Sequence, residues 1–424
     1  MKALLVSANT EQINMPTLPL GMACIAAATR LKGHEVEVID LMAEMDSRAT
    51  IKKVIEGFQP EIIGISVRNI DDQDMEIPKF LLDPVRDVVE ACRSFSSAPI
   101  VLGGAGYSIF PESALTYLGA DMGIQGEGEW SFLLLIKSIQ EGLSLSEVPG
   151  LYLPGHGLQG RRAFARKLDD FPLPDIQLIS TSQDKGTDFW LPVQTRRGCP
   201  IRCSYCSTET IEGCLIRKRS PETIVQWLAR CVEAGVRGFH FVDNTFNLPP
   251  SYADALCSRI IEADLNIRWR CILYPGNLDE ALVRKMAEAG CMEVSLGFES
   301  GSDRILETMN KRFKSRDVAL AARMLGDYGI QRMGFLMLGG PRETRTTVEE
   351  SLSFVQSLDL ETLKLTIGIR IYPYTKLARM AVEEGTIAAD DTLLFPKFYL
   401  AKGTEEWLRR TVDACLAEHP NWIN

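Results

Sequence analysis

The sequence predicts an α/β protein in which a doubly wound parallel sheet precedes a partial barrel of six strand–helix units. Short apolar runs alternate with amphipathic helical stretches along most of the chain, as they do in parallel sheets whose strands are joined by helices. A segment rich in proline and glycine, residues 146–188, interrupts this alternation once. The chain has 424 residues, which is too long for one ordinary core. We therefore expect two main domains joined by that segment as a linker.

Residues 1–145 carry the first series of apolar runs, and a glycine follows several of them. Doubly wound sheets bind their ligands beyond the carboxyl ends of the strands. Gly103, Gly104 and Gly126 lie at such ends, where the absence of a side chain lets a ligand approach the backbone. The alternative is that these glycines only form turns. The expected strands are residues 3–8, 36–41, 62–67, 99–106 and 121–126.

Residues 189–385 carry the second series, which contains six strand–helix units. A complete eight-unit barrel typically needs about 250 residues, so a partial six-stranded barrel is the economical interpretation. Residues 386–424 are expected to form a helical C-terminal extension. The expected strands of the barrel are residues 190–195, 238–243, 267–275, 292–300, 330–340 and 363–373.

Composition narrows the possible partners and the compartment. The net charge of −10 makes nucleic acid or an anionic membrane a poor general partner. We find no run of eighteen apolar residues for a membrane span, and the first residues read as a strand rather than a signal peptide. Eleven cysteines without an export signal favour reduced thiols in the cytoplasm over disulfides.

Three of the cysteines are clustered in the segment RRGCPIRCSYC, directly after an expected strand. They are Cys199, Cys203 and Cys206. Thiolates are the ligands of iron–sulfur clusters, and three ligands from one loop leave one iron of a cubane open to a small molecule. Cys214, eight residues further on, leaves a four-thiolate zinc site as the alternative.

The spacing Cys199-x3-Cys203-x2-Cys206, with the aromatic Tyr205 before the third cysteine, resembles the radical S-adenosylmethionine (SAM) superfamily. The resemblance covers about residues 190–385. It implies a [4Fe-4S] cluster that cleaves SAM reductively, with electrons from an external donor such as flavodoxin or ferredoxin. A small-molecule substrate is expected, and its identity cannot be read from the sequence.

Three further strand ends resemble SAM-binding positions of this superfamily. The fourth strand ends in a Glu-Ser pair where relatives contact SAM. The second ends in an Asp-Asn pair where many relatives have Gly-Gly-Glu, and this departure leaves the role of the pair open. The fifth ends in the Gly-Gly of a GGPxET pattern near the adenine. Helix caps or turns are the alternative for each. The pairs are, in this order, Glu299 and Ser300, Asp243 and Asn244, and Gly339 and Gly340.

Residues 1–145 resemble the cobalamin-binding domain of cobalamin-dependent radical SAM proteins, on the stretches LPLGMACIAAATRLKGHEVEVID, EIIGISVRN, VLGGAG and GIQGEGEWSF. One group of such domains supplies an axial histidine from an Asp-x-His-x-x-Gly loop. The corresponding loop here, NTEQINMPTLPLG, has no histidine. Cobalt would then face water, nothing or another side chain, and Arg68 and Asn69 at the end of the third strand are the best-placed candidates. The alternative for Arg68 is an ion pair with an aspartate of the following loop.

Together the resemblances imply a class B radical SAM methyltransferase that methylates an unactivated carbon of a small molecule or of a natural-product or lipid precursor. One SAM would methylate cobalamin, and a second would yield a 5′-deoxyadenosyl radical that activates the substrate. The displaced dimethylbenzimidazole tail of cobalamin would lie against Gly103, Gly104 and Gly126. Cyclisation, rearrangement or dehydration, with or without cobalamin, stays open. So does a non-catalytic SAM- or cobalamin-binding iron–sulfur protein.

Overall fold

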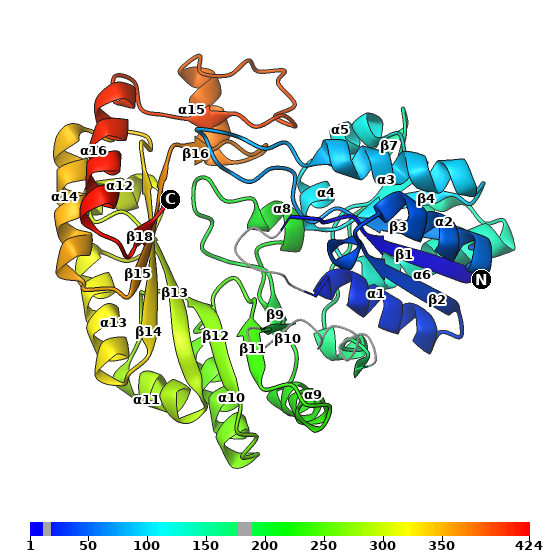
Figure 1. Ribbon diagram of the computed structural model, residues 1–424, viewed down its shortest axis with the longest axis horizontal. Helices are drawn as coiled ribbons and strands as arrows, with labels where there is room; N and C mark the ends of the chain where they lie inside the picture. The colour runs from blue at the N-terminus through cyan, green and yellow to red at the C-terminus, as the bar shows by residue number, and fades with distance from the viewer. Residues whose placement is uncertain (12–17, 177–188) are drawn as a thin grey trace.

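Two α/β units, each built on a seven-stranded sheet, stand side by side in the computed structural model, which describes residues 1–11, 18–176 and 189–424 (Figure 1). The N-terminal unit runs from blue to blue-green in Figure 1, and the C-terminal sheet runs from green to red. The predicted fold class, a doubly wound parallel sheet followed by a partial barrel, is confirmed. No helix among the described residues is long and apolar enough to cross a membrane.

The N-terminal sheet has the strand order β2-β1-β3-β4-β5-β6-β7, and its first five strands are parallel. Both faces of this sheet are buried, which explains why β1 is apolar at every position from residue 3 to residue 6. Leu4 and Val6 pack into the core under one layer of helices, whereas Ala3 and Leu5 pack under the other. The strands are β1 (Lys2–Ser7), β2 (Glu35–Asp40), β3 (Ile62–Ser66), β4 (Ile100–Gly103), β5 (Met122–Ile124), β6 (Leu151–Leu153) and β7 (Gly157–Leu158).

Helices cover both faces of this sheet, as expected for a doubly wound fold. Contacts between helices pair α1 with α6 and α2 with α3. The side chain of Asp46 caps the start of α2 by accepting a hydrogen bond from the backbone N–H of Ala49. The helices are α1 (Leu20–Leu31), α2 (Ser47–Phe58), α3 (Leu82–Phe95), α4 (Ala105–Ile109), α5 (Pro111–Leu118) and α6 (Gly128–Glu141).

The first part of the segment that we expected to be a linker belongs to the N-terminal sheet. β6 and β7 lie within residues 146–188 and extend the N-terminal sheet in antiparallel fashion. The apolar run LYLP, residues 151–154, indicates a short strand in the sequence, and β6 confirms it. Its pairing with β5 and the two-residue strand β7 leave no local pattern.

The C-terminal sheet is parallel throughout and has the order β18-β15-β14-β13-β12-β11-β8. Alternate side chains of its strands pack against the outer helices, and the others face the concave side of the sheet. In β12, for example, Trp269 and Cys271 are buried in the outer core, whereas Ile272 is exposed. The strands are β8 (Leu191–Val193), β11 (Gly238–Phe241), β12 (Arg268–Leu273), β13 (Cys291–Glu299), β14 (Gln331–Leu338), β15 (Thr362–Ile367) and β18 (Trp422–Ile423).

The helices of this unit lie on the convex side of the sheet and run along its outer edge in Figure 1. Their buried residues join the strands in one large core. They are α9 (Pro221–Glu233), α10 (Pro250–Glu262), α11 (Glu280–Glu288), α12 (Asp303–Thr308), α13 (Ser315–Asp327), α14 (Arg345–Ser357) and α16 (Glu405–Glu418).

The C-terminal extension contains more than the expected helix. Within it, β17 (Phe398–Tyr399) pairs in a small antiparallel ribbon with β16 (Ile369–Arg370), which follows β15 and precedes the extension. The helix α15 (Lys376–Glu383) lies between these two strands in the chain. After α16 the chain adds β18 to the barrel beside β15, so the sheet has a seventh strand that was not predicted. This strand has only two residues, and such a length gives no pattern in the sequence.

Candidate functional site

The three-cysteine loop lies between two short strands that close its base. β9 (Arg196–Arg197) precedes the loop, β10 (Arg217–Lys218) follows it, and the two strands pair in antiparallel fashion. Gly198 adopts a φ of 89°, and a Cβ there would lie 2.2 Å from the carbonyl oxygen of Leu215, so only glycine fits at this turn. The short helix α8 (Thr208–Glu212) completes the loop.

Cys199, Cys203 and Cys206 are free and partly buried in this loop. Burial raises the pKa of the Cys203 thiol to about 11, and it also raises the pKa of Cys199. These thiols are therefore protonated at neutral pH, and a bound metal centre would be what stabilises their thiolates. Within the described residues no three side chains of His, Cys, Asp or Glu converge on a single metal ion. A cubane cluster binds each cysteine through a different iron, so the fit of the loop to a cluster does not require such convergence.

Tyr205, Glu299 and Lys311 form a buried group beside the cysteines. Oε1 of Glu299 accepts hydrogen bonds from the Tyr205 hydroxyl and from Nζ of Lys311, both at 3.2 Å. The ammonium group of Lys311 lies 5.5 Å from the centre of the Tyr205 ring. Burial opposes the charge of Lys311, but Glu299 and the neighbouring thiols outweigh it and raise the Lys311 pKa. No local pattern indicates Lys311, because its neighbours in space come from other elements of the chain.

The other predicted strand-end residues are engaged in local structure. Asp243 is fully buried, and its carboxylate accepts hydrogen bonds from the backbone N–H groups of Thr195 and Arg196 at 2.8 and 2.9 Å. It thus fixes the turn between β8 and β9. The hydroxyl of Ser300 lies 3.0 Å from that of Ser351 and accepts the N–H of Ser302, so it caps the chain after β13.

The Gly339-Gly340 turn after β14 is held by Glu343. Oε2 of Glu343 accepts the backbone N–H groups of both glycines, at 2.9 Å for Gly340. Its other oxygen is buried and has no hydrogen-bond partner among the described residues. Burial raises the Glu343 pKa to about 7, against the opposing effect of the two N–H groups.

Glu212, at the end of α8, connects the cysteine loop to its surroundings, and sequence reasoning missed it. Oε2 accepts hydrogen bonds from the backbone N–H of Gly198 at 2.9 Å and from Nδ2 of Asn244 at 2.7 Å. Oε1 accepts one from the side chain of Gln194 at 2.8 Å. Asn244, which was predicted to bind a cofactor, therefore lies beside the base of the cysteine loop.

A cavity of about 470 Å³ lies between the glycine-rich edge of the N-terminal sheet and the base of the cysteine loop. Gly103, Gly104 and Gly126 line it, as do Ile211 and Glu212 of α8. A Cβ on Gly103 would find its nearest neighbour 4.0 Å away, so this position faces open space. The volume is in the range typical of small-molecule sites. The glycines leave one wall of the cavity without side chains, so a ligand can approach the backbone there.

Arg68 and Asn69 follow β3 at the same edge of the sheet. Both line a small cleft next to the large cavity, and Arg68 also lines the large cavity itself. Burial lowers the Arg68 pKa from its ordinary value, and Asp40 opposes this effect. Asp71, in the loop after β3, pairs with Arg370 of β16, with Oδ2 2.8 Å from Nε.

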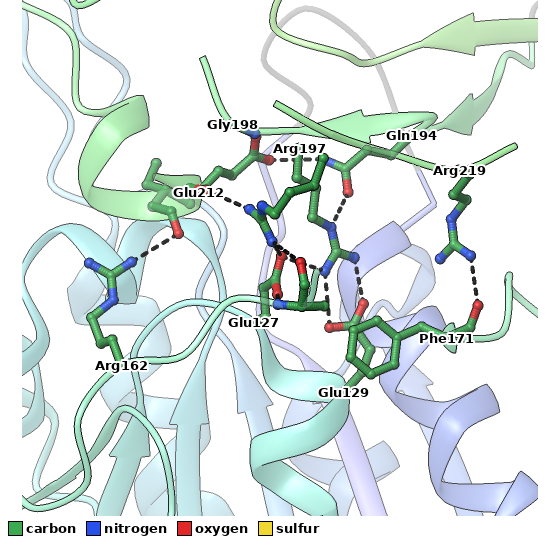
Figure 2. Close-up of polar contacts among 12 residues, drawn as sticks. Glu127, Glu129, Arg162, Phe171, Gln194, Arg197, Gly198, Glu212 and Arg219 are labelled. Carbon is green, nitrogen blue, oxygen red and sulfur yellow. Dashed lines mark hydrogen bonds and ion pairs between the residues drawn. The ribbon is translucent and has the colours of Figure 1, made fainter. Parts of the chain in front are cut away.

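Buried ion pairs join the two units beside the cavity (Figure 2). Nη2 of Arg197 lies 2.5 Å from Oε1 of Glu129, and Arg217 pairs with Glu127. All four side chains are at most 10% exposed. Burial would raise the Glu129 pKa, but Arg197 more than offsets it, and the pKa is lowered. The two carboxylates lie in the stretch GIQGEGEWSF that resembles cobalamin-binding domains. Their partners were not predicted, because ion pairs across domains leave no local pattern.

Two family models match the chain. The radical SAM superfamily matches residues 193–355, and the B12 binding domain matches residues 6–136. An uncharacterized methyltransferase of Pyrococcus horikoshii is 29% identical over 90% of this chain and 83% of its own length. Tryptophan 2-C-methyltransferase of Streptomyces laurentii is 23% identical over 89% of this chain and 74% of its own length.

A solved structure shares the whole fold. The radical SAM methyltransferase TsrM of Kitasatospora setae, with cobalamin and a [4Fe-4S] cluster bound, superposes with a TM-score of 0.87 at 20% identity, covering 100% of this chain and 90% of that chain. The two matched domains define the cofactors as a [4Fe-4S] cluster, SAM and cobalamin. The chain belongs to the cobalamin-dependent radical SAM enzymes, the family of the methyltransferases with which it aligns.

Proposed function

We propose that this enzyme transfers a methyl group from SAM, by way of cobalamin, to a carbon atom of a small organic molecule. The observation that carries the proposal is the position of the cavity, which lies directly behind the cysteine loop. When bound, the cluster supplies the electron that cleaves SAM, and cobalamin carries the methyl group. We further propose that a cytoplasmic flavodoxin or ferredoxin delivers that electron.

Cys199, Cys203 and Cys206 would hold the cluster in this proposal. Tyr205 and Glu299, with Lys311, would form the wall against which SAM lies, while Asn244 and the Gly339-Gly340 turn border the same edge of the barrel. Asp243 and Ser300 would act by fixing the turns that carry these groups, since their polar atoms are already engaged. A Glu299→Gln variant should assemble the cluster and bind SAM more weakly than the parent in equilibrium dialysis.

The concave face of the barrel would hold the substrate. Ile272, Met333 and Phe335 give it apolar surface, and the side chain of Lys364 stands beside Phe335 in the neighbouring strand. The side chains on this face are only partly buried, in contrast to the fully buried outer core. Such a wall suits a small molecule with an apolar body.

Cobalamin would bind with its tail in the cavity and with no protein nitrogen on cobalt. His34 lies at the opposite edge of the N-terminal sheet, where its Nδ1 is 3.3 Å from the N-terminal nitrogen. Arg68 and Asn69 would face the corrin instead, and a cationic Arg68 cannot ligate cobalt. Electron paramagnetic resonance of the cob(II)alamin form should therefore show no nitrogen superhyperfine splitting. Splitting of that kind would overturn the ligand-free arrangement, and failure to bind cobalamin would overturn the methyltransferase proposal.

A further inference from the structure

The strand that leads into the cysteine loop is anchored in the N-terminal unit. Arg197 lies in β9, two residues before Cys199, and its guanidinium crosses to the first turn of α6. There Nη2 and Nη1 donate to the two oxygens of Glu129 at 2.5 and 3.2 Å. Nε donates to Gln194 at 2.9 Å, so the guanidinium is held on two sides (Figure 2). A fork-to-fork pair of this kind fixes orientation as well as distance.

The other side of the loop is anchored in the same place. Arg217 of β10, which is paired in register with Arg197, binds Glu127. The second oxygen of Glu127 accepts the backbone N–H of Ala165 at 2.7 Å. One arginine from each strand at the base of the cysteine loop thus pairs with a carboxylate of the same short segment. That segment follows β5 of the N-terminal unit. Leaving any of these buried charges without its partner is costly, so displacing one side chain of a pair opposes the position of the other.

Three of these four side chains line the cavity that the cobalamin tail would occupy. Glu127, Glu129 and Arg197 all border it, together with Ile211 and Glu212 of α8. Glu212 in turn accepts the N–H of Gly198, directly before Cys199. A ligand in the cavity would therefore contact the side chains that set the position of the cysteine loop, and an ordered loop would complete the wall of the cavity.

We propose that the Glu127–Arg217 and Glu129–Arg197 pairs couple the two cofactor sites, so that cluster binding tightens the binding of cobalamin through its nucleotide tail. The coupling is reciprocal by thermodynamic necessity, and it makes Arg197 and Glu129 positioning residues. The inference rests on the proposed function only in placing the tail in this cavity. It predicts an order in assembly: a chain that has lost its cluster also releases its cobalamin more readily.

The test compares dissociation constants for cobalamin and for cobinamide, the corrin that lacks the nucleotide tail, by absorbance titration without oxygen. The cluster-loaded protein is compared with the Cys203→Ala variant, which lacks the cluster. We expect cobalamin to bind about tenfold more tightly to the cluster-loaded protein, a factor within the usual range for coupled sites. Cobinamide should bind equally to both. Equal cobalamin affinities of the cluster-loaded and cluster-free proteins would overturn the coupling. If the cluster tightened the binding of cobinamide as much as that of cobalamin, the coupling would not act through the tail.

Two variants test whether the buried ion pairs carry the coupling between the two cofactor sites. In the Glu129→Gln protein, cobalamin should bind almost equally well with and without the cluster, because the neutral side chain no longer holds Arg197. Asp71→Asn is the matched control, since Asp71 and Arg370 also form a buried pair between the units but do not border the cavity. The Asp71→Asn protein should retain the difference in cobalamin affinity between its cluster-loaded and cluster-free forms. If the Glu129→Gln protein kept the full difference in cobalamin affinity, these ion pairs would not carry the coupling between the two cofactor sites. If the cluster-loaded parent bound neither corrin, the proposed function would fail as well, an outcome distinct from a lost coupling.

Discussion

At the scale of single residues, the site depends on charges that are buried together. Lys311 and Glu299 are 7% and 12% exposed in their side chains, and they are held beside Tyr205 and the cysteines. A buried pair contributes little over apolar side chains, yet removing one partner leaves a charge in a medium that solvates it poorly. The pair therefore makes the arrangement around the cluster loop specific rather than the protein as a whole more stable.

Replacing Lys311 with methionine should lower the free energy of unfolding of the cluster-free protein by about 3 kcal/mol, because Glu299 would stay buried without its cation. Lys285→Met is the control: Lys285 pairs with Asp254 at 2.6 Å, but both side chains are about a third or more exposed. That change should cost less than about 1 kcal/mol. Urea unfolding measures both values, and similar small losses would show that the Lys311 pair is not buried in solution.

At the scale of elements, strand ends hold most of the polar groups. The Gly339-Gly340 turn after β14 is an example, since both of its N–H groups are satisfied by one carboxylate with a pKa of about 7. A carboxyl group with a pKa raised above its unfolded value of about 4.5 binds its proton more tightly when folded. Its contribution to stability is present at acid pH and is lost as the pH rises through about 7.

The variant Glu343→Gln tests this assignment. In the parent, the Glu343 group should lower the free energy of unfolding by about 2 kcal/mol between pH 5 and pH 7.5, from a shift of roughly 2.5 pKa units. The glutamine variant should lack this part of the pH dependence. Urea unfolding of both proteins at the two pH values gives the difference, and identical pH slopes would show that Glu343 is ionised in the folded protein at pH 5.

The sequence predicted those elements whose pattern is local and long. The strands of both sheets and the cysteine loop follow from apolar periodicity and from ligand spacing, and the structure places them as expected. The short strands β7 and β18 were not predicted, because each has only two residues and leaves no periodic pattern. Asp243 shows the same limit for the site: the sequence does not reveal that two backbone N–H groups of the preceding turn donate to its carboxylate. Its contact with a cofactor stays a prediction.

At the scale of the whole molecule, the cavity exists only because the two units meet. Gly103 lies on one wall of it, and the base of the cysteine loop forms the other. A leucine at position 103 should fill the cavity without a clash, because a Cβ there has no neighbour within about 4 Å. We expect cobalamin affinity to fall more than tenfold, with little change in the midpoint of thermal unfolding.

Gly57→Leu provides the control for this change, since Gly57 lies on the exposed face of α2 with open space around it. It should leave cobalamin binding unchanged in the same absorbance titration. Equal affinities of the two variants would remove the cavity from the cobalamin site and leave the cluster assignment untouched.

The central claim is that this chain cleaves SAM at a cluster held by Cys199, Cys203 and Cys206. The most direct measurement is the yield of 5′-deoxyadenosine after anaerobic reconstitution with iron, sulfide, cobalamin, SAM and a strong reductant. We predict that the parent and the Cys214→Ala variant form 5′-deoxyadenosine, whereas Cys203→Ala forms none. If the parent assembles its cluster, binds SAM and yields no 5′-deoxyadenosine, reductive cleavage is contradicted. If Cys214→Ala loses the cluster as completely as Cys203→Ala, the three-cysteine site with an open iron is contradicted.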